Sequence, residues 1–360
     1  MSYSYTNDKL KDIRKNKLHS GKIIDFYVQM SNEFTDFKDK YLNKSHRLLD
    51  CMFFWDWEKY EQHKTLDLKK LNRCKDKYCS NCKQIAVASS LFEVLPIFKA
   101  LVDEGYKPLL FTLTVPNVSA DLLPGTIDKL FSKFKTFYDY FEKPINSRRS
   151  YKGRSYSIVG AIRALEITYN AESDTYHPHL HIMAFAIGDF VDLKKTMKYS
   201  KKINKKTKCE IGFQLSEADL EIRRLWTNLY NDKDQRTINK LNESDLYLCD
   251  VKEITTNQGI LEALKYSCKN SEISSYEVFK TLYFALWNRK IKQGYGRLYS
   301  LKFDDQEDIK DDTETLFSDE VPQSIVLSLN DLISSYQNYE KISRFRARDL
   351  LPIVKNNLKD

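Results

Sequence analysis

Three of the six histidines in this chain of 360 residues lie close together, at His177, His179 and His181. They fall in an apolar run over 176–187, which is typical of a buried strand. Residues two apart in a strand point to the same face, so the three imidazoles are expected to line one side of it. Imidazole is a common ligand of divalent metal ions, and the pattern therefore indicates a metal site.

A carboxylate is placed to complete this set of ligands. The run 157–169 is typical of a second strand, and the polar segment Asn170–Thr175 between the two runs is typical of a hairpin connection. A turn centred in this segment sets Glu166 directly opposite His179, with Cβ atoms roughly 5 Å apart. With His181 they form an open site for Mn²⁺, Mg²⁺ or another divalent ion. The alternative is a cluster of surface histidines on a polar sheet face.

A second group of reactive side chains lies on a helix expected over 258–270. Glu262, Tyr266 and Lys269 fall on one face of this helix, within about two turns. The face carries a carboxylate, a phenol and an ammonium. A free phenol titrates at about pH 10, so tyrosine needs help to act as a nucleophile, and a neighbouring lysine or a metal-bound phosphate would supply it. The alternative is an ordinary amphipathic surface helix.

The cysteines favour metal binding over disulfides. Seven cysteines is an odd number, and the polar N-terminus lacks the apolar core of an export signal. Cys74, Cys79 and Cys82 provide three of the four ligands that a closed zinc site needs, and His63 is one candidate for the fourth. The alternative is a set of reduced thiols that are buried or incidental.

Charge and hydropathy bear on the partners and the location of the protein. The chain has 58 basic and 50 acidic residues, a net charge of +8, which is compatible with a polyanionic partner. An exposed, positively charged loop is expected at Arg148, Arg149, Lys152 and Arg154. No apolar run approaches the roughly 20 residues needed to span a bilayer, so we expect a cytoplasmic protein without a membrane partner.

Three segments together resemble the ordered motifs of the HUH endonucleases, specifically the rolling-circle replication initiators of small plasmids from Gram-positive bacteria. The segments are Phe111–Asn117, Tyr176–Ile182 and Glu262–Tyr266, the last followed by Lys269. Their order and spacing match over roughly residues 45 to 300. In one branch of this family a single tyrosine follows a glutamate by four residues, as Tyr266 follows Glu262 here.

The resemblance implies a mechanism. His179 and His181 would be metal ligands, and His177 would be a further ligand or a contact to the phosphate. Tyr266 would attack the scissile phosphate to give a 5′-phosphotyrosine and a free 3′-OH. Glu262 would act as general base on a water at termination.

The resemblance also implies further residues and partners. Lys269 and Lys265 would steady the phosphate, and Cys51 would be the fourth ligand of a structural Zn²⁺, because family members often carry a cysteine at a comparable place. The partners would be plasmid origin DNA with a hairpin at the nick site, a host helicase and a host polymerase.

We therefore expect an α+β protein, with a central antiparallel sheet, flanking helices and an N-terminal cysteine-bearing region. The histidines should lie on the middle strands, with the Glu262–Tyr266 helix packed across them. The expected organisation is a zinc-bearing region (1–104), a nuclease domain (105–300) with a lysine-rich insertion (about 189–245), and an acidic linker with a helical tail (301–360). Besides the two hairpin strands and the helix over 258–270, we expect strands over 108–116 and 246–254, and helices over 83–103, kinked or interrupted at Pro96, 128–142 and 217–230.

Three rival functions remain open. Two histidines and a carboxylate also suit the Fe(II) of a mononuclear non-haem iron enzyme. A non-catalytic zinc DNA-binding protein would need the histidines only for structure. A relaxase or transposase of the same superfamily would share the chemistry but not the substrate.

Overall fold

The computed structural model describes residues 2–142, 156–188, 193, 197–203, 210–232, 245–264, 272–301, 303, 317 and 319–345. Its contacts divide the chain into two compact units. The cysteine unit comprises Met1–Phe92, Ile273–Lys280 and Phe303–Asp360, and the histidine unit comprises Glu93–Glu272 and Thr281–Lys302. The predicted division at residues 104 and 300 differs from this one, chiefly because the C-terminal segment groups with the N-terminal region.

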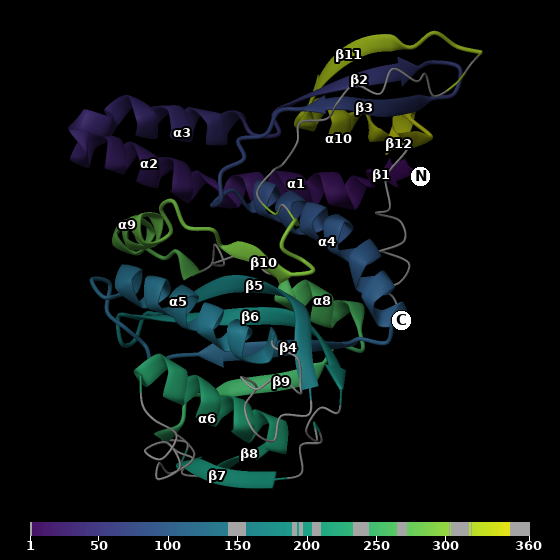
Figure 1. Cartoon of the computed structure of the whole chain (residues 1–360). Helices are drawn as coiled ribbons and strands as arrows, with labels where there is room; N and C mark the ends of the chain where they lie inside the picture. Colours follow the sequence, from purple (N-terminus) through teal and green to yellow (C-terminus); the bar gives the residue numbers. More distant parts are fainter. Residues whose placement is uncertain are drawn as a thin grey trace. The chain divides into compact units, whose positions relative to one another are not determined.

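The described part of the histidine unit contains an antiparallel sheet of five strands in the order β10-β5-β6-β4-β9 (Figure 1). The strands are β4 (Lys107–Thr114), β5 (Tyr156–Asn170), β6 (Thr175–Gly188), β9 (Cys249–Glu253) and β10 (Lys292–Gly296). The sheet confirms the predicted α+β class, with the histidine strand β6 at its centre. Edge strand β10 was not among the sequence predictions. A separate hairpin, β7 (Met197–Ile203) and β8 (Glu210–Leu215), lies within the lysine-rich region.

Two amphipathic helices, α5 (Leu123–Glu142) and α6 (Glu217–Asn231), cover one face of this sheet (Figure 1). The ring of Phe137 on α5 packs edge-on against Phe111 of β4 and against Trp226 of α6. A capping box, with Ser216 and Asp219 each accepting from the other's backbone N–H, fixes the start of α6. Both helices were predicted from their apolar spacing.

Shorter elements complete the histidine unit. Helix α8 (Asn257–Ala263) packs against β5 and β6, as expected for the helix that carries Glu262. Its last residue is Ala263, and the rest of the helix predicted to residue 270 lies outside the described residues, apart from Leu264 at the C-cap. Helix α9 (Tyr276–Ala285) begins among residues of the cysteine unit and ends among those of the histidine unit.

The described part of the cysteine unit has a sheet of five strands in the order β1-β12-β3-β2-β11. These are β1 (Ser2–Ser4), β2 (Phe54–Tyr60), β3 (Thr65–Leu71), β11 (Gln323–Ser328) and β12 (Lys341–Phe345), with helices α1 (Asn7–His19), α2 (Gly21–Glu33), α3 (Lys38–Asp50) and α10 (Leu329–Ser334) and the 3₁₀ turns Thr35–Phe37 and Tyr336–Asn338. Trp55 and Trp57 of β2 stack on each other in the core, and the ring of Tyr5 meets both edge-on.

The prediction of a helical tail within residues 301–360 is wrong for two segments, which form strands β11 and β12. β11 pairs antiparallel with β2, and β12 pairs parallel with β3. A short apolar run such as that of β11 suits a helix or a strand about equally, and pairing with a distant strand decides between them. Residues 346–360 lie outside the described residues.

Helix α4 (Ser80–Asp103) is a single helix with Pro96 inside it, so the proline does not interrupt it as the sequence analysis allowed. Of the helices in the described ranges, α4 alone is long and apolar enough to cross a membrane by length and composition. This corrects the prediction that no apolar run reaches that length. Core helices of globular proteins meet the same criterion.

Candidate metal centres

The hairpin of β5 and β6 sets the register of the histidine cluster. Glu166 pairs directly with His179, as the position of the turn predicted, and Ala164 pairs with His181. Because side chains alternate along a strand, the Glu166 carboxylate and both imidazoles point to the same face of the sheet. We call this face, which also carries His177, the histidine face.

The three ligand side chains converge on one point. The Nε2 atom of His181 lies 2.8 Å from Oε2 of Glu166, and Nε2 of His179 lies 3.4 Å from the same oxygen. The ligand atoms of the three residues all lie within 4.8 Å of one another. All three residues are buried, with between 5% and 8% of the surface of each residue exposed.

The opposite ring nitrogens have partners of their own. Nδ1 of His179 lies 3.1 Å from the backbone oxygen of His177. A carbonyl oxygen only accepts, so Nδ1 carries the hydrogen, and in a neutral ring the Nε2 lone pair is left for a metal. Nδ1 of His181 lies 3.4 Å from Oγ1 of Thr112 on β4. Such contacts orient histidine ligands in metal sites.

The electrostatics favour an ionised carboxylate. Burial alone would raise the pKa of Glu166, but the hydrogen bonds and charges of His179 and His181 outweigh it, and the pKa lies well below its ordinary value. His177 is half-buried, and its ring stacks on that of His179 with centroids 5.1 Å apart. Burial, aided by the charge of His179, lowers the pKa of His177. His177 lies beside the converging group and is not one of its members.

The donor set fits a divalent cation. One carboxylate and two imidazoles on adjacent strands of a rigid sheet provide three ligands from one side. A structural zinc site would need four protein ligands, so three are better suited to a cation that keeps positions for other ligands.

The Glu262 helix is described only in part. Glu262 lies on α8, and its Oε2 accepts from Nζ of Lys252 on β9 at 3.0 Å. Tyr266, Lys265 and Lys269 lie outside the described residues, as do the residues of the predicted positively charged loop, Arg148, Arg149, Lys152 and Arg154.

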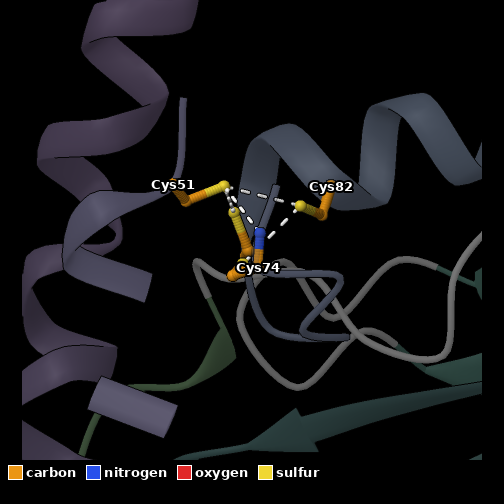
Figure 2. A group of neighbouring side chains, drawn as sticks. Cys51, Cys74 and Cys82 are labelled. Carbon is orange, nitrogen blue, oxygen red and sulfur yellow. Dashed lines mark hydrogen bonds between the residues drawn. The ribbon is translucent and has the colours of Figure 1, made fainter. Parts of the chain in front are cut away.

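The four cysteines Cys51, Cys74, Cys79 and Cys82 form a second cluster. Figure 2 shows three of them, Cys51, Cys74 and Cys82. Cys51 caps α3, Cys74 follows β3, Cys79 lies in the turn before α4, and Cys82 lies in the first turn of α4. The Sγ atom of Cys51 lies 3.7 Å from that of Cys79 and 3.6 Å from that of Cys82, and Cys74 and Cys82 are also 3.6 Å apart. All four are buried.

These distances fit a tetrahedral metal site. Zn–S bonds of about 2.3 Å put the sulfurs of a Cys₄ zinc site about 3.8 Å apart, whereas a disulfide has a bond of about 2.05 Å. The backbone N–H groups of Cys74 and Asp76 donate to Sγ of Cys51 and Cys74, each at 3.4 Å. Such N–H···S contacts stabilise thiolates.

Neighbouring groups hold the cysteine loop and balance its charge. The buried carboxylate of Asp76 accepts from the hydroxyl of Tyr27 at 2.8 Å and from Nζ of Lys44 at 3.1 Å. The Nζ atom of Lys17 is buried, and burial lowers the pKa of this lysine although Cys51, Asp50 and Cys79 act to raise it. A zinc ion with four thiolates carries two net negative charges, so an adjacent ammonium favours the loaded state.

Cys51, and not His63, completes the cluster. The ring of His63 stacks on Phe317 with centroids 3.7 Å apart, and its Nε2 lies 3.2 Å from Oδ1 of Asp319. From spacing alone, His63 remained a candidate for the fourth ligand, whereas the family resemblance implied Cys51. Thr112, Lys252 and Asp76 were not predicted from the sequence, because none of them has a recognisable spacing to the residue it contacts.

Comparisons with known proteins indicate a replication protein. A family model described as a replication protein matches residues 65–203, which include the histidine hairpin and three of the four cysteines. A protein named Protein rep from Bacillus sp is 28% identical over 144 residues, which are 40% of this chain and 43% of that protein. Protein rep from Bacillus amyloliquefaciens is 30% identical over 144 residues, 40% of this chain and 39% of that protein.

Protein rep from Staphylococcus aureus is 28% identical over 161 residues, 43% of this chain and 64% of that protein. The matched region thus spans less than two thirds of the length of each of these relatives. No solved structure matches the chain. The histidine hairpin and Cys74, Cys79 and Cys82 lie in the region that matches the replication-protein family model, and the relatives named here come from Gram-positive bacteria. These similarities support a plasmid replication protein.

Proposed function

We propose that this protein initiates rolling-circle replication of a plasmid by nicking one strand of its origin. The observation that carries the proposal is the convergence of Glu166, His179 and His181 on the central strands of a sheet. This cluster lies inside the region that matches replication proteins. A replication protein that only bound DNA would have no need of a buried carboxylate between two oriented imidazoles.

Glu166, His179 and His181 would hold Mn²⁺ or Mg²⁺. Such an ion, when bound, would polarise the scissile phosphate and stabilise the charge that develops on it. Tyr266 would then attack the phosphorus. The phenol gives up its proton to solvent as a bond forms between the phenolic oxygen and phosphorus, the P–O3′ bond breaks, and the departing 3′ oxygen takes up a proton. The products are a 5′-phosphotyrosine and a free 3′-OH, from which a host polymerase can extend.

Glu262 would serve a different step. After one round of replication, the regenerated origin must be cut again, and a single tyrosine is already bonded to DNA. A water molecule attacks the phosphorus at the regenerated site, with Glu262 as the general base that takes its proton. The P–O3′ bond breaks, and the departing 3′ oxygen takes up a proton, which leaves a free 3′-OH and a free 5′-phosphate. Lys265 and Lys269 would steady the phosphate, and Arg148, Arg149, Lys152 and Arg154 would contact the DNA backbone. A Zn²⁺ held by the four cysteines would stabilise the cysteine unit.

A covalent-capture assay tests the proposal. Labelled single-stranded oligonucleotides that tile the DNA flanking the coding sequence are incubated with the protein and Mn²⁺ or Mg²⁺, then separated on a denaturing gel. We expect a shifted band that needs the metal and disappears in Tyr266→Phe. A band that persists in Tyr266→Phe would assign the nucleophile to another residue.

The same assay separates the rival functions. A non-haem iron enzyme or a non-catalytic zinc protein would give no covalent band with any oligonucleotide. A relaxase or transposase would give a band with DNA from a transfer origin or an element end, and none with the flanking plasmid sequence.

A further inference from the structure

The edge strand β9 places a lysine on the histidine face. Val251 is fully buried in the core, so its neighbour Lys252 points to the opposite side of the sheet. Lys252 pairs with Leu110 of β4, and Leu110 pairs with Met183 of β6. Met183 lies two residues after His181 on the same strand, so Lys252 shares a face with the metal ligands.

The helix that carries Glu262 is tied to this strand. Only three residues, 254–256, separate β9 from α8. The backbone N–H of Ile254 donates to Pro108 at 2.8 Å, which extends the pairing with β4. The helix passes close over Ile254, because a Cβ added at Gly259 would lie 3.1 Å from its Cγ2 atom. The residues of α8 that anchor the helix are buried: Ile260, Ala263 and the C-cap residue Leu264.

Lys252 on β9 and Glu262 on α8 form an ion pair across the connection between the two elements. Nζ of Lys252 lies 3.0 Å from Oε2 of Glu262, and the two side chains are 45% and 27% exposed. An ion pair this exposed contributes little to folding stability. It is one contact that restricts the rotation of this carboxylate, which belongs to a residue on a short helix. A general base must be held within hydrogen-bonding reach of its water, so this restriction bears on catalysis.

We infer that Lys252 is a positioning residue for Glu262 in the hydrolytic cut of the regenerated origin. The inference rests on the proposed function, in which Glu262 is the general base. Lys252 itself touches no reacting atom. It holds the carboxylate over the histidine face, and the Tyr266 step, which does not use Glu262, proceeds without it.

The two steps can be measured separately. Adduct formation by Tyr266 is followed with the captured oligonucleotide in the presence of Mn²⁺. Hydrolysis is followed in the Tyr266→Phe background, where a cut must leave a free 5′-phosphate and no protein on the DNA. Each assay compares the parent with Lys252→Met, Lys252→Arg and Glu262→Gln. Lys107→Met, which removes an exposed lysine at the start of β4, controls for the loss of one positive charge.

A general base contributes about 10²- to 10⁴-fold, so Glu262→Gln should abolish most of the hydrolysis. Lys252→Met should slow hydrolysis roughly tenfold through the rate constant and not through the apparent KM for DNA, because orientation is part of that contribution. Lys252→Arg, which keeps a cation within reach, should recover most of the rate. Adduct formation should stay within about twofold of wild type in Lys252→Met and Lys252→Arg, and the melting temperature of Lys252→Met should be unchanged.

Other outcomes would overturn the inference. Hydrolysis by Lys252→Met at the parental rate, or a loss equal to that of Lys107→Met, would show that the ion pair has no role in the cut. A loss that Lys252→Arg does not restore, accompanied by a lower melting temperature, would assign Lys252 to the fold. Absence of any adduct in wild type would instead overturn the proposed function, and the inference with it.

Discussion

Glu166 pairs in register with His179, yet its shorter contact is to His181, diagonally across the hairpin: Nε2 of His181 lies 2.8 Å from Oε2 of Glu166, and Nε2 of His179 lies 3.4 Å from it. One oxygen therefore faces both imidazoles. The cluster is set by the pairing of two strands and does not depend on any loop. Its geometry should survive changes elsewhere in the chain.

Replacing the carboxylate should weaken metal binding at this site. Glu166→Gln removes the only charged ligand of the three and leaves a neutral oxygen of the same size. We expect the affinity for Mn²⁺ to fall at least about tenfold. Loss of a residue that only hydrogen-bonds a metal ligand already costs about that much, and Glu166 is a ligand itself. Mn²⁺ binding is measured by electron paramagnetic resonance. His177→Gln is the control, and should bind within about threefold of wild type, because its ring lies beside the converging group. Equal losses in the two variants would contradict the three-ligand assignment.

Thr112, whose hydroxyl contacts Nδ1 of His181, should contribute to metal affinity. Thr112→Val keeps the shape of the side chain and removes the hydroxyl at 3.4 Å from Nδ1 of His181. Loss of such supporting contacts typically costs about 10- to 100-fold in metal affinity, and the length of this one suggests the lower end of that range. Thr112→Ser keeps the hydroxyl and should bind Mn²⁺ nearly as well as wild type. If valine and serine bind alike, the contact has no orienting role.

The cysteine cluster should hold one zinc ion per chain. Cys51→Ser should lose most of this zinc, as measured by elemental analysis, and should unfold at a lower temperature, because a structural zinc site contributes directly to folding. His63→Ala should keep its zinc, since His63 contacts Phe317 and Asp319. Zinc loss in His63→Ala with retention in Cys51→Ser would reverse the ligand assignment.

The tyrosine that holds the cysteine loop should stabilise it. Tyr27 is fully buried and donates to Asp76, two residues after Cys74. Tyr27→Phe leaves Asp76 with one donor fewer, so we expect a loss of about 1–3 kcal/mol in the free energy of unfolding, measured with urea. Zinc should also leave faster in the presence of a chelator. Tyr169→Phe removes an exposed hydrogen bond to Asp174 in the histidine unit and should change neither quantity.

The two clusters differ in how far sequence alone could place their residues. Opposition of Glu166 and His179 follows from the length of one hairpin, because the turn fixes the register of both strands. Cys51 lies 23 residues before Cys74, on the far side of β2 and β3, and no periodicity relates the two. The resemblance pointed to Cys51, while spacing alone left His63 as a candidate.

The ion pair between Lys252 and Glu262 could not be predicted from the periodicity of the sequence. The two residues are ten positions apart, one on a strand and one on a helix, and they meet because only residues 254–256 separate β9 from α8. For a related reason, strands β11 and β12 were not predicted. Their partners, β2 and β3, lie more than 250 residues earlier in the chain.

The wide separation of these strands has a consequence for synthesis on the ribosome. Until residues 323–345 have been made, β2 and β3 lack the partners that cover their outer sides, and unpaired strand edges invite association with other chains. The cysteine unit therefore cannot finish folding until β11 and β12 have been translated, whereas the β5–β6 hairpin can pair as soon as it emerges. A chain cut short by a premature stop codon would carry the histidine cluster but would have an incomplete cysteine unit. The unpaired edges of β2 and β3 in such a chain would favour its association with other chains.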